Sequence, residues 1–415
     1  PVRVRFAPSP TGPLHIGGVR TALYNYLFAK KNNGTFILRI EDTDQKRFVE
    51  GAESYINQSL EWLGIGVDEG VVQGGPLGPY KQSERMDKYA TYAKQLVNDG
   101  YAYYAFDTPE ELTEMRSKLE ASNMSAKYDS TSRMSMKNSL TLSEDEVNER
   151  LERGDNYIIR IKLPRNEEIR FHDVIRGWIV FNSSQLDDKV ILKEDGLPTY
   201  HLANIVDDHL MEISHVIRGE EWLPSAPLHV MLYRYLGWED TMPKFAHLPL
   251  ILKPDGKGKL SKRDGDRLGF PVFPIEWKSP EGDISSGYRE SGYLPEAVVN
   301  MLSMLGWHPT DNQELFTLDE LVEVFELDRV SKSGAKFDMD KSKWFNHQFL
   351  MKSSAQELKA MIEDQLLPIH AQRGEEYLIK VIDLLKEKVT FPAELLSMGH
   401  YFFDLPLSYD EKVQR

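Results

Sequence analysis

The sequence has 415 residues, of which 41% are hydrophobic, and its formal net charge is −15. At about 100–150 residues per domain, a chain of this length holds roughly two to four domains. It contains no cysteine, which excludes disulfides and thiolate zinc sites, and its 11 histidines show no paired metal spacing. No stretch approaches the ~18 apolar residues of a membrane span, and the start of the chain does not resemble a secretory signal. These features predict a soluble, cytoplasmic protein with no membrane partner.

The negative charge does not exclude a nucleic-acid partner. Basic side chains neutralise phosphates only within a Debye length of about 8–10 Å, so a local basic surface matters more than the charge of the whole chain. An acidic protein can therefore hold one RNA along one face, while its overall charge limits non-specific binding.

The first third of the chain alternates strand and helix patterns. They occur in the order 2–6 (strand), 17–32 (helix), 35–40 (strand) and 52–63 (helix). Such alternation is typical of a parallel sheet covered by helices, so we predict an α/β fold. The sheet is expected to resume at residues 190–192 and 212–217, with helices between and after them.

A different pattern interrupts this alternation. A helix is predicted at 83–100 and a strand at 101–106. The segment TPEE at 108–111 supplies the N-cap, N1 proline and capping-box glutamate of another helix. Residues 157–181 have a strong β pattern. We interpret about 70–190 as an α+β insertion within the parallel fold.

The last third of the chain is predicted to be all-α. Helices are expected at 294–305, 318–325, 355–366 and 376–388. The preceding segment, 267–288, is rich in glycine, proline and serine and is expected to be a loop.

The segment RFAPSPTGPLHIGG at 5–18 combines a strand, a Pro/Gly turn and the start of a helix. Gly17 and Gly18 let a ligand approach the backbone closely, and a helix N-terminus offers unpaired N–H groups and a partial positive charge to phosphates. His15 stands where it can form a hydrogen bond with a triphosphate. By itself, this pattern is more often a tight turn with a surface histidine.

A second segment, KGKLSKRDG at 257–265, is a glycine-flanked basic loop. Such a loop can close over a triphosphate, where Lys259 and Lys262 would neutralise charge that develops at the α-phosphate and on pyrophosphate. Alone, it is more often a solvated basic loop.

Taken together, the two segments resemble the HIGH and KMSKS signatures of class I aminoacyl-tRNA synthetases. Within that class, four further motifs are similar to bacterial-type glutamyl-tRNA synthetases. They are LRIEDTD at 38–44, GPYKQSER at 78–85, LPTYHLANIVDDHLM at 197–211 and VIRGEEW at 216–222. The resemblance is close over residues 2–350 and looser beyond. Six ordered motifs make a chance similarity negligible.

The resemblance implies a Rossmann-like catalytic domain, an insertion that binds the tRNA acceptor end, a junction that contacts the tRNA stem and a helical anticodon-binding domain. The corresponding residues are 1–75 with 190–265, 76–189, 266–350 and 351–415. The last region is interpreted as incomplete, because the chain ends at Arg415 on a charged stretch, earlier than a whole anticodon domain would.

The resemblance also implies a site for L-glutamate. Its two carboxylates and its ammonium should meet guanidinium groups and an acid, respectively. Arg5 and Arg218 are expected to bind carboxylate, and Glu41 the ammonium. The other side chains expected in this pocket are Ala7, Ser9, Tyr200 and Asn204. Glutamine should be rejected, because a buried Arg218 facing a neutral amide loses its partner charge at a cost of about 1–3 kcal/mol.

ATP is implied as the second substrate. The expected catalytic residues are His15, Lys259 and Lys262. The residues expected to contact ATP are His15, Gly17, Gly18, Glu221, Trp222, Lys259, Leu260, Ser261, Lys262 and Arg263. Of these, Glu221 and Trp222 would lie near the adenosine, although Trp222 is equally consistent with core packing.

The implied chemistry has two steps and no protein nucleophile. Glutamate attacks the α-phosphate of ATP, and the terminal 2′-hydroxyl of tRNA(Glu) then attacks the adenylate. Mg²⁺ is expected to be held by phosphates and water, so Asp42 and Asp44 are interpreted as structural. No zinc is predicted, because Tyr101 and Tyr103 stand where some relatives carry thiols.

Several alternatives compete with this interpretation. A glutamine-specific enzyme is disfavoured by Arg218 and the helical tail, and the short paralogue that modifies a tRNA base is disfavoured by the tail alone. A nucleotidyltransferase would share the ATP cradle but would not explain the LPTYHLAN and VIRGEEW motifs. A non-catalytic tRNA-binding protein would be expected to lack His15 or the lysines of the basic loop.

Three properties are left open by the sequence. The first is whether the enzyme charges glutamate tRNA alone or also misacylates glutamine tRNA, because that choice depends on anticodon contacts in the divergent helical region. The family resemblance suggests that activation needs bound tRNA. A monomer is the default expectation.

Overall fold

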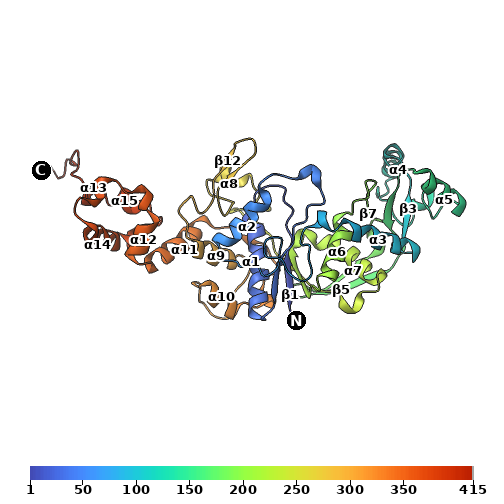
Figure 1. Ribbon diagram of the computed structural model, residues 1–415, viewed down its shortest axis with the longest axis horizontal. Helices are drawn as coiled ribbons and strands as arrows, with labels where there is room; N and C mark the ends of the chain where they lie inside the picture. The colour runs from blue at the N-terminus through green and yellow to red at the C-terminus, as the bar shows by residue number, and fades with distance from the viewer. Residues whose placement is uncertain (414–415) are drawn as a thin grey trace.

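The computed structural model describes residues 1–413, and the molecule is elongated (Figure 1). The short helices α13 (Pro368–Ala371) and α15 (Glu394–Met398) lie at one end, and α4 (Pro109–Ala121) and α5 (Glu144–Arg153) lie at the other. The N-terminal strand β1 (Arg3–Phe6) and helix α1 (Ile16–Lys31) lie between the two ends.

The centre of the molecule is the predicted parallel arrangement. Its elements are β1, α1, β2 (Thr35–Leu38), α2 (Ala52–Trp62), α6 (Tyr200–Leu210), β8 (His215–Gly219), α7 (Ala226–Tyr235) and β9 (Lys244–Leu248). β1 pairs in parallel with β2, and β8 pairs in parallel with β9. Ser214 joins the two pairs, because its N–H donates to Arg3 O (2.8 Å) and its Oγ accepts from Arg3 N (2.9 Å). The parallel α/β fold is confirmed.

The prediction that residues 190–192 resume the central sheet is wrong. They form β7 (Val190–Leu192), which pairs antiparallel with β4 (Ile158–Ile161) in a separate sheet that also contains β3 (Ala102–Ala105). The hairpin of β5 (Glu168–Asp173) and β6 (Gly177–Asn182) joins the central sheet instead, with Asp173 in parallel register with Phe245 of β9. A strand pattern specifies which face is buried but not which strand is its neighbour, so this exchange was invisible in the sequence.

The separate sheet carries the helices of the insertion, α3 (Met86–Asn98), α4 and α5. Thr108 caps α4 as predicted, because its side chain accepts from Glu111 N (3.2 Å). The Glu111 carboxylate instead accepts from Lys137 Nζ (2.8 Å), and the predicted capping box is half formed.

The C-terminal third is helical, as predicted. Its helices are α9 (Pro295–Ser303), α10 (Leu318–Val324), α11 (Met339–Lys352), α12 (Ala355–Met361), α13, α14 (Glu375–Leu385) and α15. Short parallel strands, β10 (Ile251–Leu252) and β13 (Ala335–Lys336), connect this part to the basic segment that precedes it.

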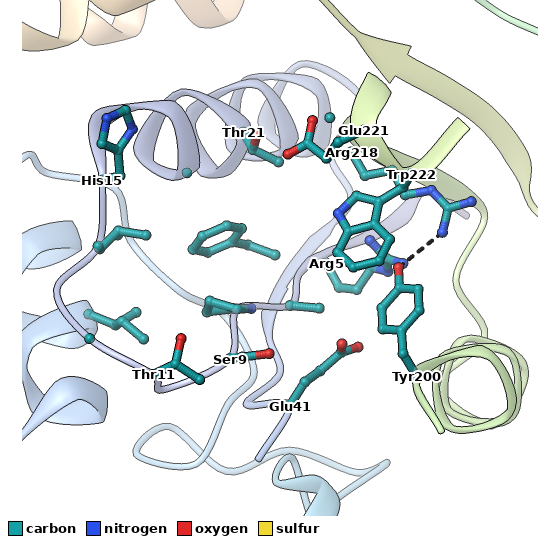
Figure 2. A pocket seen from close by; sticks show the side chains of 18 of the residues that line it. Arg5, Ser9, Thr11, His15, Thr21, Glu41, Tyr200, Arg218, Glu221 and Trp222 are labelled. Carbon is teal, nitrogen blue, oxygen red and sulfur yellow. Dashed lines mark hydrogen bonds between the residues drawn. The ribbon is translucent and has the colours of Figure 1, made fainter. Parts of the chain in front are cut away.

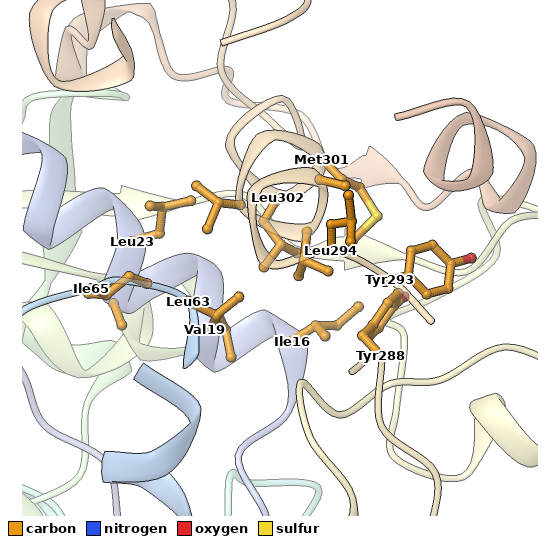
Figure 3. Close-up of a cluster of buried hydrophobic side chains, with 14 of the residues drawn as sticks. Ile16, Val19, Leu23, Leu63, Ile65, Tyr288, Tyr293, Leu294, Met301 and Leu302 are labelled. Carbon is orange, nitrogen blue, oxygen red and sulfur yellow. The ribbon is translucent and has the colours of Figure 1, made fainter. Parts of the chain in front are cut away.

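Residues 267–288 are more ordered than the predicted loop. They follow the start of α8 (Asp264–Leu268) and contain an antiparallel hairpin, β11 (Trp277–Lys278) and β12 (Ile284–Ser285). Tyr55 of α2 donates to Ile275 O (2.6 Å), and the N–H of Ile16 donates to Val272 O (2.9 Å). Figure 3 shows Tyr288 packed with Ile16 and Leu294 in the same apolar cluster. Long-range apolar contacts therefore order a segment whose composition alone favours a loop.

We expect G287A to destabilise the protein while G66A does not. A Cβ at Gly287 would lie 2.2–2.5 Å from backbone atoms of Ile275 and Glu276, whereas a Cβ at Gly66 would meet nothing within 4 Å. The free energy of unfolding in urea should fall by about 1–3 kcal/mol for G287A, as for other overpacked sites. Equal stability of the two variants would contradict the packed arrangement of this segment.

Candidate active site

The hollow beside the N-terminus of α1 contains two adjoining cavities. Figure 2 shows the one that is lined by Arg5 and Arg218. The arginine cavity, of about 290 Å³, is lined by Arg5 and Arg218, and the lysine cavity, of about 450 Å³, by Lys259 and Lys262. They share His15, Gly18, Thr21, Gly219, Glu221 and Lys262. Ligands of parallel α/β sheets bind at the carboxyl ends of the strands, and β1 and β8 both end here.

Asp208 of α6 forms ion pairs with two guanidiniums, of which that of Arg5 lines the arginine cavity. Its carboxylate accepts from Arg5 Nε and Nη2 (2.8 and 3.0 Å) and from Arg39 Nη1 (2.7 Å). Burial alone would raise the pKa of Asp208, but Arg5 and Arg39 outweigh it and hold this pKa below its usual range. Arg5 therefore reaches the cavity as one half of an ion pair.

Glu41 lies beside this cluster with one oxygen already engaged. Its Oε1 accepts from Arg39 Nη2 (3.0 Å) and Asn204 Nδ2 (3.2 Å), whereas Oε2 meets no donor within residues 1–413. Burial raises the pKa of Glu41, and Arg39 and Arg5 oppose this shift. The open oxygen suits an ammonium group.

Arg218 differs from Arg5 because no carboxylate pairs with it in the described part of the chain. It is only 4% exposed. Its Nε donates to His247 Nε2 (3.1 Å), and Nη1 donates to Tyr200 Oη (3.1 Å) and lies 3.2 Å from His229 Nδ1. Its Nη2 is buried without a partner. A cation left in this state favours an anionic ligand.

Trp222 stacks on Tyr200 at the mouth of the arginine cavity, as Figure 2 shows. The ring centroids lie 4.2 Å apart at an angle of 24°, and Trp222 is 38% exposed. This exposure rules out core packing for Trp222 and leaves an aromatic surface available to a ligand.

His15 caps α1 and lines both cavities. Gly17 N–H donates to His15 Nδ1 (3.0 Å), so the neutral ring carries its proton on Nε2. Burial, with Lys262 and Lys259 nearby, lowers the pKa of His15 to about 4. His15 is therefore a neutral hydrogen-bond donor at pH 7.

The basic loop meets the turn that precedes α1. A Cβ at Gly12 would lie 3.3 Å from Lys262 Nζ, which makes no ion pair within residues 1–413. Lys259 Nζ contacts Glu221 Oε1 at 3.3 Å. The Asp264 carboxylate helps to hold the loop, because its Oδ2 accepts from Ser261 N and from Ser261 Oγ, both at 2.7 Å. Burial lowers the pKa of Lys262. The two signature segments, 5–18 and 257–265, thus lie side by side in the structure.

The chain is similar to known proteins in both sequence and structure. The family model described as "tRNA synthetases class I (E and Q), catalytic domain" matches residues 1–344. The chain belongs to this class I tRNA synthetase family. Glutamate–tRNA ligases from Cytophaga hutchinsonii and Parabacteroides distasonis are both 60% identical to this synthetase, over 414 and 420 residues. These matches cover 99% and 100% of the chain and 80% and 82% of the relatives.

Solved structures agree with this assignment. The crystal structure of a glutamate tRNA ligase from Elizabethkingia meningosepticum, in complex with its amino acid, has a TM-score of 0.94 and 52% identity to this synthetase. The match covers 100% of this chain and 82% of that chain. The glutamate–tRNA synthetase of Elizabethkingia anophelis has a TM-score of 0.93 and 53% identity, with 100% and 83% of the two chains covered.

The structure brings most of the predicted site residues of the synthetase together. The arginine cavity is lined by Arg5, Ala7, Ser9, Glu41, Tyr200, Asn204, Arg218, Glu221 and Trp222. The lysine cavity is lined by Gly17, Gly18, Lys259, Leu260, Ser261 and Lys262, and His15 lines both. Arg263 lines neither cavity.

Sequence reasoning missed the residues that hold the arginines. Arg39 and Asp208 lie within the LRIEDTD and LPTYHLANIVDDHLM motifs, so the quoted motifs contained a signal for them. His229 and His247 lie outside every quoted motif, and only their buried contacts with Arg218 identify them.

Asp42 and Asp44 have the structural roles that were predicted. Ser83 N and Oγ donate to the Asp42 carboxylate (2.8 and 2.7 Å), and Asp44 pairs with Arg47 at 2.6 Å. Within residues 1–413, no three His, Cys, Asp or Glu side chains are grouped as a metal site. The two tyrosines that stand where some relatives carry thiols make other contacts: Tyr103 donates to Asp188 (2.6 Å), and Tyr101 stacks on Tyr235.

Within residues 1–413, no helix is both long and apolar enough to span a bilayer.

We expect H15Q to change how stability depends on pH. The folded-state pKa of His15 is about 4, below the ordinary value of about 6.5 that applies when the chain is unfolded. Between these values the unfolded state binds more protons, so the contribution of His15 to stability is present above pH 6.5 and is lost as pH falls toward 4. The free energy of unfolding of wild type should fall relative to that of H15Q as pH is lowered through this range, and parallel curves would contradict the shifted pKa.

Proposed function

We propose that this synthetase activates L-glutamate with ATP and transfers it to the 3′-terminal adenosine of tRNA(Glu). The observation that carries the proposal is Arg218, a buried guanidinium that has no carboxylate partner and has an unbonded Nη2 among residues 1–413. The side-chain carboxylate of glutamate would supply the missing charge. Glutamine would leave it missing, at a cost of about 1–3 kcal/mol or more.

The charge balance of the arginine cavity supports glutamate as the substrate. Buried charged groups that line it are Arg5, Arg218 and Glu41, and Arg39 and Asp208 lie directly behind Arg5 and Glu41. These five groups carry one excess positive charge, and the buried Asp173 carboxylate reaches Arg218 only through His247. Glutamate, with two carboxylates and one ammonium, brings one net negative charge, whereas glutamine is neutral. In this proposal Glu41 Oε2 accepts from the α-ammonium and Arg5 contacts carboxylate through its remaining N–H groups.

The lysine cavity would hold ATP across the N-terminus of α1. The N–H of Gly18, which has no acceptor within residues 1–413, and the Nε2–H of His15 would face the phosphates in this arrangement, whereas the N–H groups of Ile16 and Gly17 are already bonded to Val272 O and His15 Nδ1. Glu221, which lines both cavities, would lie toward the adenosine, whereas Trp222 lines the arginine cavity and not the lysine cavity, and Lys259 and Lys262 would neutralise the phosphates. Mg²⁺ bound to the phosphates and water would add further positive charge there.

Activation joins the two cavities. An oxygen of the glutamate α-carboxylate attacks the α-phosphorus of ATP in line, the bond to the bridging oxygen breaks, and pyrophosphate leaves. Lys262 lies at the boundary, where it can stabilise charge on the α-phosphate and on the leaving group. Most of the catalysis is positioning, so no protein nucleophile is required.

The transfer step needs room for the tRNA end beside the glutamate. A cavity of about 200 Å³ adjoins the arginine cavity and shares Glu41, Tyr200 and Trp222 with it. Its other lining includes the half-exposed Phe48 and Lys193, an aromatic ring and a cation that suit a nucleoside and its phosphate. The 2′-hydroxyl would attack the adenylate carbonyl there, and AMP would leave.

The elongated shape supports a division of the tRNA along the molecule. The insertion lies at one end and the C-terminal helices at the other, with β1 and α1 between them (Figure 1). The cavities are lined by residues at the end of β1 and the start of α1. In the proposal the insertion binds the acceptor end, residues 266–350 contact the stem, and the region from 351 begins the anticodon-binding part. We infer further that the synthetase works in the cytoplasm as a monomer and needs no zinc.

ATP–pyrophosphate exchange tests the proposed function directly. It should be measured with L-glutamate or L-glutamine, each with and without tRNA. We expect exchange with glutamate only, appearing or rising sharply when tRNA is added. Absence of exchange under all four conditions would overturn the catalytic proposal in favour of a tRNA-binding protein.

Substitutions of two lysines of the basic loop distinguish the effect of a charge at the reaction centre from that of a charge on the loop surface. K262M should lower kcat for exchange by about 10²–10³-fold, as removal of a transition-state donor does. K257M should change kcat by less than about twofold, because Lys257 is exposed and lines neither cavity. Similar losses in both variants would show that the loop acts only through its overall charge.

A further inference from the structure

Two buried histidines hold the Arg218 guanidinium from behind. His247 Nε2 accepts from Arg218 Nε at 3.1 Å, and His229 Nδ1 lies 3.2 Å from Arg218 Nη1. Both imidazoles are fully buried. Because Arg218 has only N–H donors, the histidine nitrogen on each side must be the acceptor.

Each histidine is in turn held by a residue farther from the cavity. Asp173 Oδ2 lies 2.6 Å from His247 Nδ1, and a carboxylate accepts, so the proton is on Nδ1 and Nε2 is free to accept from Arg218. His201 Nδ1 lies 3.1 Å from His229 Nε2, which must carry the proton because His229 Nδ1 accepts. The two histidines are thus fixed in opposite tautomers.

Asp173 itself is rigidly placed. Its Oδ1 accepts from Ile175 N and Arg176 N (both 2.9 Å), and Oδ2 also accepts from His247 N (3.0 Å). These backbone bonds connect the end of β5 to β9. The orientation of His247, and through it that of Arg218, is therefore built into the central sheet.

The neutral acceptors orient Arg218 without cancelling its charge. Burial lowers the pKa of His247 to about 4, and burial together with Arg218 lowers that of His229 well below its usual value. Arg5 shows the contrast, because Asp208 takes two of its N–H groups and its charge. A carboxylate directly on Arg218 would leave little for a ligand, whereas imidazoles leave the charge and Nη2 available.

We propose that His247 and His229, held in fixed tautomers by Asp173 and His201, are positioning residues that determine the preference of the site for a carboxylate over a carboxamide. This inference rests on the proposed function and deepens it. The selectivity then depends on residues that never touch the substrate.

The test compares H247Q with H247L. Glutamine can still accept from Arg218 and donate to Asp173, whereas leucine can do neither. H247L should weaken calorimetric binding of L-glutamate, and raise its KM in exchange, by at least about tenfold, the effect of one lost charge-assisted hydrogen bond. H247Q should restore most of this loss. The KM for ATP should stay within about twofold in both, because the lysine cavity does not include His247.

The ratio of glutamate to glutamine affinity provides the second readout. This ratio should fall in H247L and stay high in H247Q. It should also stay high in H172L, a control at an exposed histidine on the same strand as Asp173. Unchanged glutamate binding in H247L, or equal losses of glutamate and ATP in both His247 variants, would overturn the inference. Wild-type protein that binds glutamate without any exchange would overturn the proposed function instead, and the binding comparison would still decide the role of His247.

Discussion

The Asp208 carboxylate lies between Arg5 and Arg39, and the rest of the site depends on this buried pairing. The three residues come from β1, the end of β2 and α6, so the cluster exists only after these elements have packed. Removing one partner of such a buried group typically costs about 3–5 kcal/mol, because the remaining charges are left without compensation. The arginine cavity can therefore form only when the sheet and α6 have packed together.

Because Asp208 pairs with Arg5 and not with Arg218, the two arginines that were both predicted to bind carboxylate have different surroundings. Arg5 is neutralised by Asp208 and helps to shape the cavity floor. Arg218 is surrounded by neutral acceptors and keeps its charge for a ligand. Burial makes this difference important, because a guanidinium without a counter-ion in a low-dielectric site interacts far more strongly with an anion than a surface arginine does.

The phosphate side of the site is arranged by backbone geometry more than by ion pairs. His15 caps α1, and Gly18 lets the helix start pack closely against Leu14, since a Cβ at Gly18 would lie 2.7 Å from Leu14 Cδ1. The basic loop reaches this helix because residues 270–288 pack against α1 and α2 through Val272 and Ile275. The segment after the basic loop thus supports it through these contacts.

Sequence alone determined the α/β class, the helical C-terminal third and the synthetase signatures, because these depend on local periodicity and on residues that are contiguous in motifs. The same motifs predicted side chains that line the two cavities, since Arg218, Glu41 and His15 lie inside them. Only the tertiary structure decided the partners. It placed β5 and not β7 beside the central sheet, paired Arg5 with Asp208, and surrounded Arg218 with His229 and His247. These contacts join segments far apart in the chain, and hydrogen-bond and charge partners across such separations leave no periodic signal in a single sequence.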